Sequence, residues 1–205
     1  MINFAILSDT VSDDIKCDIM KICRIIALVA ALGMIPLAAS AQNKKVSAMN
    51  GEHKILVAYF SATGTTERVA KTIASVTGGE LFRITPTEEY SAADLDWTDS
   101  DSRCCRENDN PASRPAFVKT KESLDGYDTI YLGFPNWWNG APRIINTFIE
   151  TYGLKGKTVI PFMTSGGSGI SNSMRVFRAT YPDVNWKDGK LLNGASRKAV
   201  EDWVK

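Results

Sequence analysis

Two adjoining stretches decide the predicted fold, Ile55-Leu-Val-Ala-Tyr-Phe60 and Ser61-Ala-Thr-Gly-Thr-Thr66. The first is a continuous apolar run rich in strand-forming residues, which is typical of a strand buried on both faces in a parallel sheet. After the second, apolar residues recur at helical spacing between Val69 and Ala74, and Gly78-Gly79 ends the helix. This order of strand, loop and helix predicts an α/β domain.

The same order recurs along the rest of the chain. Further strands are predicted at Leu81–Ile84, Thr129–Phe134, Thr158–Met163 and, more weakly, Val184–Leu192. Further helices are predicted over Ile144–Ile149, Ile170–Tyr181 and Ala195–Val204. Alternating strands and helices of this kind build one parallel sheet with helices on both faces.

Two segments fit this pattern poorly. Thr85–Arg114 is polar and irregular and is interpreted as a solvated excursion. Within it, Tyr90, Asp94 and Trp97 either cover a bound ligand as a lid or belong to an ordinary surface loop. Pro161 lies inside a predicted strand, although proline cannot donate to a ladder, so it is expected at a sheet edge or a bulge.

The loop Ser61–Thr66 offers four hydroxyl groups and a glycine between a buried strand and the start of a helix. Helix-start N–H groups and the helix dipole favour an anion, so a phosphate is the predicted occupant. No lysine stands where a nucleoside-triphosphate loop would place one, and the glycine pattern of dinucleotide folds is missing. A plain helix cap is the alternative, but a cap needs only one hydroxyl.

Three ordered motifs resemble those of the flavodoxin family. They are Thr63-Gly-Thr-Thr66, Gly133-Phe-Pro-Asn-Trp-Trp138 with Ala141-Pro142, and Thr164-Ser-Gly-Gly-Ser-Gly169. The likeness covers Lys54–Lys205 and is to members with P-x-W-W and T-S-G-G-S-G loops. The resemblance implies a three-layer flavodoxin-like α/β fold, with a doubly wound, five-stranded parallel sheet in the strand order 2-1-3-4-5.

The resemblance also implies that the domain binds FMN through these three loops. The first loop would hold the phosphate, Trp137 would stack on the flavin ring, and Trp138 would touch or shield it. The glycine-rich third loop would meet the pyrimidine edge of the flavin. The predicted cofactor-binding residues are Ser61, Ala62, Thr63, Gly64, Thr65, Thr66, Pro135, Asn136, Trp137, Trp138, Asn139, Gly140, Thr164, Ser165, Gly166, Gly167, Ser168 and Gly169.

The chain departs from the family pattern just after the stacking tryptophan. Family members usually have glycine there, and its peptide can reorient toward the flavin, whereas this chain has Asn139 followed by Gly140. Asparagine tolerates a positive φ better than other non-glycine residues, so the same reorientation is expected to remain open.

The leading functional prediction is an electron carrier that uses FMN, serves an unidentified redox partner protein and needs no catalytic side chain. One alternative is an NAD(P)H-dependent FMN oxidoreductase resembling quinone or azo reductases, and another is a binding module without redox function. A serine hydrolase is disfavoured, because Ser168 lacks the G-x-S-x-G context and the single histidine, His53, precedes the first strand.

The segment from Met20 to Ala41 has the pattern of a secretory signal peptide. Lys21 and Arg24 precede an apolar run, and the run ends at a small-residue cleavage site. Residues 1–19 are interpreted as a mis-assigned start, residues 42–53 as a linker and residues 54–205 as the flavodoxin-like domain. We therefore expect an exported protein, periplasmic or secreted, with no stable membrane insertion after cleavage.

The composition gives no support to several other classes. With 24 basic and 23 acidic residues the net charge is +1, which gives no support for a nucleic-acid partner. One histidine and two cysteines after the signal peptide do not fit the usual zinc sites, so no metal is expected. Adjacent Cys104 and Cys105 would form only a strained, reducible disulfide, and they are interpreted as loop thiols without a role.

Overall fold

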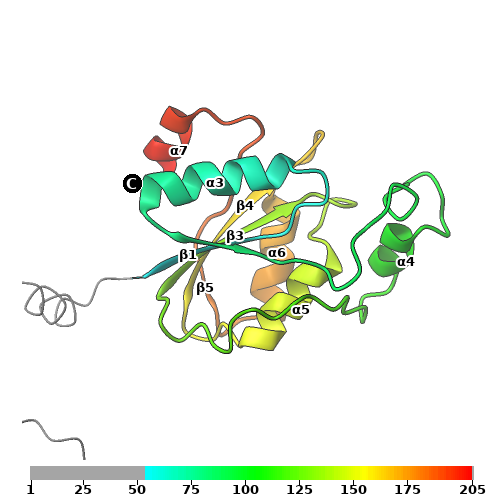
Figure 1. The fold of residues 1–205 in the computed structure, drawn as a ribbon, viewed down its shortest axis with the longest axis horizontal. Coiled ribbons are helices and arrows are strands. Elements are labelled where there is room, and N and C mark those ends of the chain that lie inside the picture. Colours follow the sequence, from blue (N-terminus) through cyan, green and yellow to red (C-terminus); the bar gives the residue numbers. More distant parts are fainter. Residues whose placement is uncertain (1–53, 205) are drawn as a thin grey trace, which may run out of the picture. The chain divides into compact units, whose positions relative to one another are not determined.

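The computed structural model describes residues 54–204, and the segments predicted as a signal peptide and a linker lie outside them. The described strands form one parallel sheet in the order β2-β1-β3-β4-β5, with β6 paired to β4 (Figure 1). Their bounds are β1 (Ile55–Tyr59), β2 (Glu80–Arg83), β3 (Thr129–Pro135), β4 (Thr158–Thr164), β5 (Asn185–Trp186) and β6 (Lys190–Leu191). The predicted doubly wound order is confirmed.

Helices cover both faces of the sheet, which gives the predicted three layers (Figure 1). One face carries α3 (Thr65–Thr77) and α7 (Arg197–Val204), and the other carries α5 (Arg143–Tyr152) and α6 (Ser171–Thr180). In β1, Leu56 and Ala58 belong to one buried cluster and Val57 and Tyr59 to the other. This alternation explains why the strand is apolar without interruption, since both of its faces are buried.

Pro161 lies in β4, which has neighbouring strands on both sides. The prediction that Pro161 lies at a sheet edge or a bulge was therefore wrong. The carbonyl groups of Val159 and Met163 accept hydrogen bonds from Lys187 and Leu192 on the outer side of β4. Because alternate residues of a strand face the same side, the nitrogen of Pro161 faces that side too. The outer ladder is interrupted there, so the predicted single strand over Val184–Leu192 is divided into β5 and β6.

The excursion between β2 and β3 contains a helix that the sequence analysis did not predict, α4 (Arg103–Asp109). Its polar sequence has no long apolar face, so helical periodicity could not reveal it. The helix is stabilised locally: Cys105 N donates to the Ser102 hydroxyl at the N-cap, and Arg103 pairs with Glu107 one turn later. The interpretation of this segment as wholly irregular was therefore wrong.

A hydrogen-bond network joins this excursion to α5 and to the C-cap of α6. The Tyr181 hydroxyl accepts from Asn146 Nδ2 at 2.8 Å and donates to Glu150 Oε1 at 2.7 Å. Glu150 in turn pairs with Arg114 of the excursion at 2.7 Å. Burial, followed by the contact with Glu150, raises the pKa of Tyr181 to about 12.

This raised pKa predicts a loss of stability at alkaline pH. The unfolded chain releases the tyrosine proton near pH 10, before the folded chain does, so the free energy of unfolding is expected to fall as the pH rises from 10 to 12. The Tyr181→Phe variant should lose stability less steeply over that range, by up to about 1 kcal/mol per pH unit. Urea unfolding at pH 8, 10 and 11 measures the difference, and identical slopes in the two proteins would contradict the prediction.

Candidate functional site

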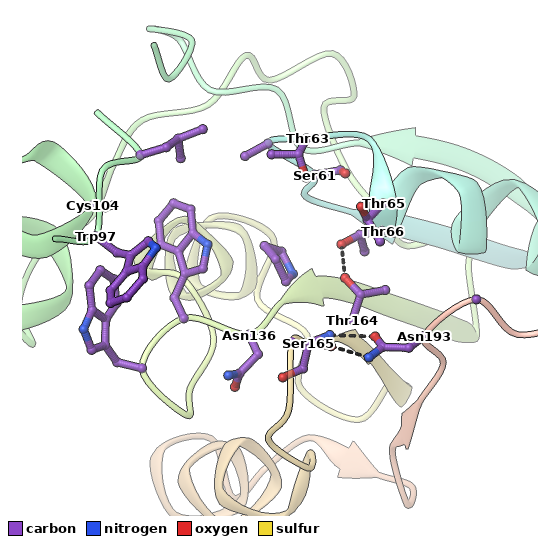
Figure 2. Close-up of a pocket in the computed structure, with 17 residues that line it drawn as sticks. Ser61, Thr63, Thr65, Thr66, Trp97, Cys104, Asn136, Thr164, Ser165 and Asn193 are labelled. Atoms are coloured by element: carbon purple, nitrogen blue, oxygen red, sulfur yellow. Dashed lines mark hydrogen bonds between the residues drawn. The ribbon is translucent and has the colours of Figure 1, made fainter. Parts of the chain in front are cut away.

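The loops after β1, β3 and β4 meet at the carboxyl ends of these strands and enclose a cavity of about 590 Å³. Hydroxyl groups gather at one end of it, and Trp97 and Cys104 lie at the other (Figure 2). The cavity is lined by Ser61, Ala62, Thr63, Thr65, Thr66, Leu95, Trp97, Cys104, Pro135, Asn136, Trp137, Trp138, Thr164, Ser165, Gly166, Asn193 and Gly194. Its volume is in the range of about 300–1,000 Å³ that is usual for ligand pockets.

The polar end is built around the start of α3. Gly64 takes a left-handed conformation, with φ of 83°, and turns the chain from the loop into the helix. No side-chain cap bonds to the start of α3 in the described structure, although four hydroxyls stand beside it. The first N–H groups of the helix lack intrahelical partners, so they are available to an anion. A plain hydroxyl cap, the alternative considered above, does not describe this geometry.

The four hydroxyls of this loop have different surroundings. Thr66 is fully buried and its Oγ1 lies 2.8 Å from Thr164 Oγ1, so it fixes the first loop to the end of β4 (Figure 2). None of the described residues lining the cavity is a lysine or an arginine. One cation does stand close by, because Arg68 Nη2 donates to Thr65 Oγ1 at 3.4 Å. Arg68, which lies one turn into the helix, is not among the predicted cofactor-binding residues.

The second loop is a two-residue turn. Trp137 and Gly140 exchange both backbone hydrogen bonds, at 2.9 and 2.8 Å, and Trp138 and Asn139 between them have φ of 45° and 59°. Positive φ at both central residues is the type I′ geometry of tight hairpins. Asn139 therefore adopts the conformation expected for it. Trp138 was not expected there, since a bulky residue at positive φ is a strained outlier, and such outliers concentrate at functional sites.

The two tryptophans of this turn lie in different environments. Trp137 packs edge-on against Phe60 and Tyr90, with ring centroids 5.7 and 5.5 Å apart. Trp138 is 44% exposed. The indole of Trp137 is therefore held by neighbouring aromatic rings, whereas the indole of Trp138 is partly exposed to solvent.

The third loop is held in place by a residue that the sequence analysis missed. Ser165 N donates to Asn193 Oδ1 at 2.7 Å, and Asn193 Nδ2 donates back to the Ser165 carbonyl (Figure 2). The Ser165 hydroxyl accepts from the N–H groups of Gly167 and Ser168. These two N–H groups are used within the loop. Of the three glycines in the loop, Gly166 lines the cavity.

Twelve of the predicted residues line the cavity and six do not. Those outside the lining are Gly64, Asn139, Gly140, Gly167, Ser168 and Gly169. They shape the loops that carry the lining residues. The lining residues that were not predicted to bind the cofactor are Leu95, Trp97, Cys104, Asn193 and Gly194. Trp97 had been considered as part of a lid or of an ordinary surface loop, and it is 73% exposed at the rim.

Asn136 indicates that the cavity is built for a polar ligand. Its side-chain Oδ1 is buried and has no hydrogen-bond partner among the described residues. A buried amide oxygen without a donor costs about 1–3 kcal/mol, so a ligand that supplies an N–H or O–H would recover this energy. The donor set as a whole suits a molecule with an anionic end and a flat, partly polar aromatic end.

A hydrogen-bond network in the excursion fixes Tyr90, whose ring packs against Trp137. The Tyr90 hydroxyl donates to Glu107 Oε2 at 2.5 Å, and Arg103 Nε donates to Glu107 Oε1 at 2.7 Å. The Arg103 guanidinium also lies over the Tyr90 ring, 4.0 Å from its centroid. Burial and the Glu107 carboxylate both raise the pKa of Tyr90. This residue thus behaves as a neutral donor that holds α4 against the site.

The Glu107→Gln variant is expected to weaken this attachment. Removing the charge leaves the largely buried Arg103 without its carboxylate, so we expect the free energy of unfolding to fall by about 2 kcal/mol. Amide hydrogen exchange should accelerate most in residues 90–107. The matched control is Glu89→Gln, because Glu89 is exposed and its pair with Arg83 spans 3.3 Å. That control should change stability by less than about 0.5 kcal/mol, and equal effects of the two variants would contradict the prediction.

Cys104 and Cys105 are not loop thiols. Both are buried, at 2% and 7% exposure, in the first turn of α4, and Cys104 lines the cavity. The helix that buries them was not predicted, because the sequence around them is polar. Burial raises the pKa of the Cys104 thiol, so it is protonated at neutral pH.

Within residues 54–204, no group of three or more His, Cys, Asp or Glu side chains could hold a metal ion. Among the same residues, none of the helices has the length and apolar character needed to span a bilayer.

A parallel sheet in this order, with a loop-built cavity at its carboxyl edge, defines the flavodoxin class of α/β folds. The model of the family described as Flavodoxin matches residues 54–205, and the chain belongs to this family. A comparison with curated proteins found no match.

Three solved structures illustrate the likeness. A protein from Bacteroides uniformis assigned as a flavoprotein is 56% identical, with a TM-score of 0.72, covering 74% of this chain and 97% of that one. One from Bacteroides eggerthii, assigned likewise, is 54% identical, with a TM-score of 0.72 and coverage of 74% and 95%. A flavoprotein from Lactobacillus acidophilus in complex with FMN is 22% identical, with a TM-score of 0.60 and coverage of 75% and 99%, which shows a shared fold.

Proposed function

We propose that this protein binds one FMN in the cavity and carries electrons between redox partners. The observation that carries the proposal is the division of the cavity into an uncapped helix start with hydroxyls and an indole-lined end. A phosphate and a flavin ring need these two environments, at opposite ends of one site. Family membership and the FMN complex of the Lactobacillus protein support the choice of cofactor.

Each loop has a distinct task in this proposal. Ser61, Thr63 and Thr65, with the start of α3, hold the phosphate, and exposed Arg68 adds a positive charge beside them. Trp137 and Trp138 hold the ring and keep water from it. Asn136 Oδ1 and the Gly166 region of the third loop offer polar groups to its edge. When bound, FMN supplies one- and two-electron redox chemistry, and the protein sets its potential through these contacts.

Cofactor binding is tested by titrating the purified full chain with FMN and following flavin fluorescence and heat of binding. We expect one FMN per chain, a dissociation constant of about 1 µM or lower, and fluorescence quenching by the adjacent indole. Riboflavin, which lacks the phosphate, should bind at least tenfold more weakly. Absence of binding would overturn the proposal and leave a binding module of another kind.

The exposure of Trp97 and Trp138, at 73% and 44%, favours a second candidate, an NAD(P)H-dependent FMN oxidoreductase. These rings rim the cavity without closing it, so a nicotinamide could approach. The FMN-loaded protein is mixed with NADPH, first alone and then with a flavodoxin reductase. An electron carrier is expected to lose its visible flavin absorbance only when the reductase is present, whereas rapid loss with NADPH alone would establish the enzyme.

We also propose that the protein is exported. The support is the basic, apolar and small-residue order of Met20–Ala41, which lies outside the described residues. N-terminal sequencing of the protein from its native host is expected to begin at Gln42. A native protein that still contains residues 20–41 would overturn this proposal.

A further inference from the structure

The tip of the second loop carries Trp138, and a helix from a distant part of the chain holds this tip. Nδ2 of Asn172, the second residue of α6, donates to the Asn139 carbonyl at 2.7 Å. Within residues 54–204, no other hydrogen bond joins Trp138 or Asn139 to another element. The two bonds between Trp137 and Gly140 fix the shape of the turn, whereas the bond from α6 fixes where its tip lies.

The base of the turn is fixed without help from α6. Asn136 N donates to the Thr164 carbonyl at 2.7 Å, which continues the pairing between β3 and β4. The indole of Trp137 packs against two other aromatic rings. The part of the loop that depends on α6 is therefore the tip, which carries Trp138.

The amide of Asn172 is itself held in one orientation. Arg175, one turn further along α6, donates from Nη2 to Asn172 Oδ1 at 2.8 Å, so Nδ2 is left to face the turn. The helix is anchored as well, because Phe177 is buried and the centroid of its ring lies 5.5 Å from that of Phe134 in β3. Asn172 thus stands on a rigid element that packs against the strand from which the turn begins.

Trp138 needs support of this kind, because its backbone is strained. A φ of 45° is unusual for a bulky residue, and such conformations persist where surrounding contacts hold them. The indole supplies part of that support at most, since Trp138 is 44% exposed. The bond that Asn139 accepts from α6 therefore helps to keep Trp138 at the wall of the cavity.

We propose that Asn172 is a positioning residue for the flavin ring, because its amide holds the tip of the second loop and so sets the Trp138 indole in place before the ligand binds. This inference rests on the proposed FMN site. An indole that is already ordered lowers the entropic cost of binding. The gain in affinity should be about three- to tenfold, which is what one hydrogen bond between neutral groups contributes.

The test replaces the amide donor by an oxygen of the same size. The purified full chain and its Asn172→Asp variant are titrated with FMN and with riboflavin. Because the indole contacts the ring that both ligands share, both dissociation constants should rise by the same factor of about three to ten. An acidic residue in the first turn of α6 favours the helix, so unfolding would not account for the loss.

The matched control is Asn185→Asp, which removes the same donor and adds the same charge elsewhere. Asn185 Nδ2 donates to Thr158 Oγ1 at 3.0 Å, and Thr158 is the first residue of β4, at the end of the strand opposite to the cavity. This control should change both dissociation constants by less than about twofold.

A double-mutant cycle shows whether Asn172 acts through the indole. In Trp138→Ala the ring contact is absent, so adding Asn172→Asp should weaken flavin binding by less than about twofold further. A further loss as large as that in the wild-type background would overturn the proposal, as would unchanged affinity for both flavins in Asn172→Asp. A loss confined to FMN would also overturn it, because it would indicate repulsion between the new charge and the phosphate. Asn172→Ala removes the donor without adding a charge and provides the same test if Asn172→Asp does not fold.

A measurement on the ligand-free protein separates this proposal from the FMN proposal. Acrylamide quenching of tryptophan fluorescence is compared between each protein and its Trp138→Phe counterpart, and the difference reports the accessibility of Trp138. Asn172→Asp should raise this accessibility by up to about twofold, since the held indole is 44% exposed. A wild type that binds neither flavin would refute the proposed function, while unchanged quenching of Trp138 would refute its positioning by Asn172.

Discussion

The Thr65→Glu variant is expected to lose at least about 100-fold in FMN affinity while keeping its fold. Thr65 is the first residue of α3 and lines the polar end of the cavity. A carboxylate there stands near the proposed phosphate, and repulsion between neighbouring like charges amounts to about 3–4 kcal/mol at an effective dielectric constant of 20. The new carboxylate would also pair with Arg68 and so remove its positive charge from the phosphate.

The same substitution suits the helix, so a loss of binding cannot be attributed to unfolding. An acidic residue in the first turn stabilises a helix by about 0.3–1 kcal/mol. Isothermal titration calorimetry with FMN and with riboflavin provides the measurement, and Thr65→Gln provides a neutral control of the same size. Riboflavin affinity should change less than threefold in either variant. A parallel loss of both ligands would show that the phosphate does not lie at this end.

The Gly133→Ala variant is expected to destabilise the domain by about 3 kcal/mol, which corresponds to a fall in Tm of about 6–12 °C for a domain of this size. A methyl group at this position would lie 2.1 Å from Phe162 Cζ on the neighbouring strand. Phe162 is fully buried, so its ring has no free space into which it can move. The cost is the overpacking of a rigid core between two central strands.

Two further variants establish the cause. Gly126→Ala adds the same methyl group where nothing lies within 4 Å, so it should be neutral or stabilise by up to about 1 kcal/mol. In Gly133→Ala/Phe162→Leu the smaller side chain makes room, and the two changes should be less damaging together than their sum by about 1–2 kcal/mol. Additive effects in urea unfolding would show that the ring is not the obstacle.

The sequence was sufficient for the fold because its strongest signals are local. Apolar runs such as Ile55–Phe60 reflect burial on both faces of a strand, and helices such as Arg143–Tyr152 bury one face with regular spacing. The edge of the sheet formed by β5 and β6 was less predictable. Pro161 is tolerated in an interior strand because the hydrogen-bond ladder between β4 and its outer neighbours is interrupted opposite it. This interruption depends on the tertiary path of Lys187–Gly189, which connects β5 to β6.

The candidate site was predicted best where hydroxyls, glycines and tryptophans follow a strand directly. Asn193 was missed because it lies 28 residues after Ser165, and only the sheet order brings the two together. Cys104 was missed because α4 depends on one cap and one ion pair. Ser102 followed by Arg103 and Glu107, four residues apart, was the signal available in the sequence.

The divided outer edge of the sheet has a consequence for association between molecules. Beyond β4 the sheet ends in two strands of only two residues each, Asn185–Trp186 and Lys190–Leu191, separated by the gap opposite Pro161. A foreign strand needs a continuous row of free N–H and C=O groups to add to a sheet, and this border presents none of useful length. Addition of a foreign strand at this border of the folded domain is therefore expected to be disfavoured, which leaves β2 (Glu80–Arg83) as the longer edge strand of the described sheet.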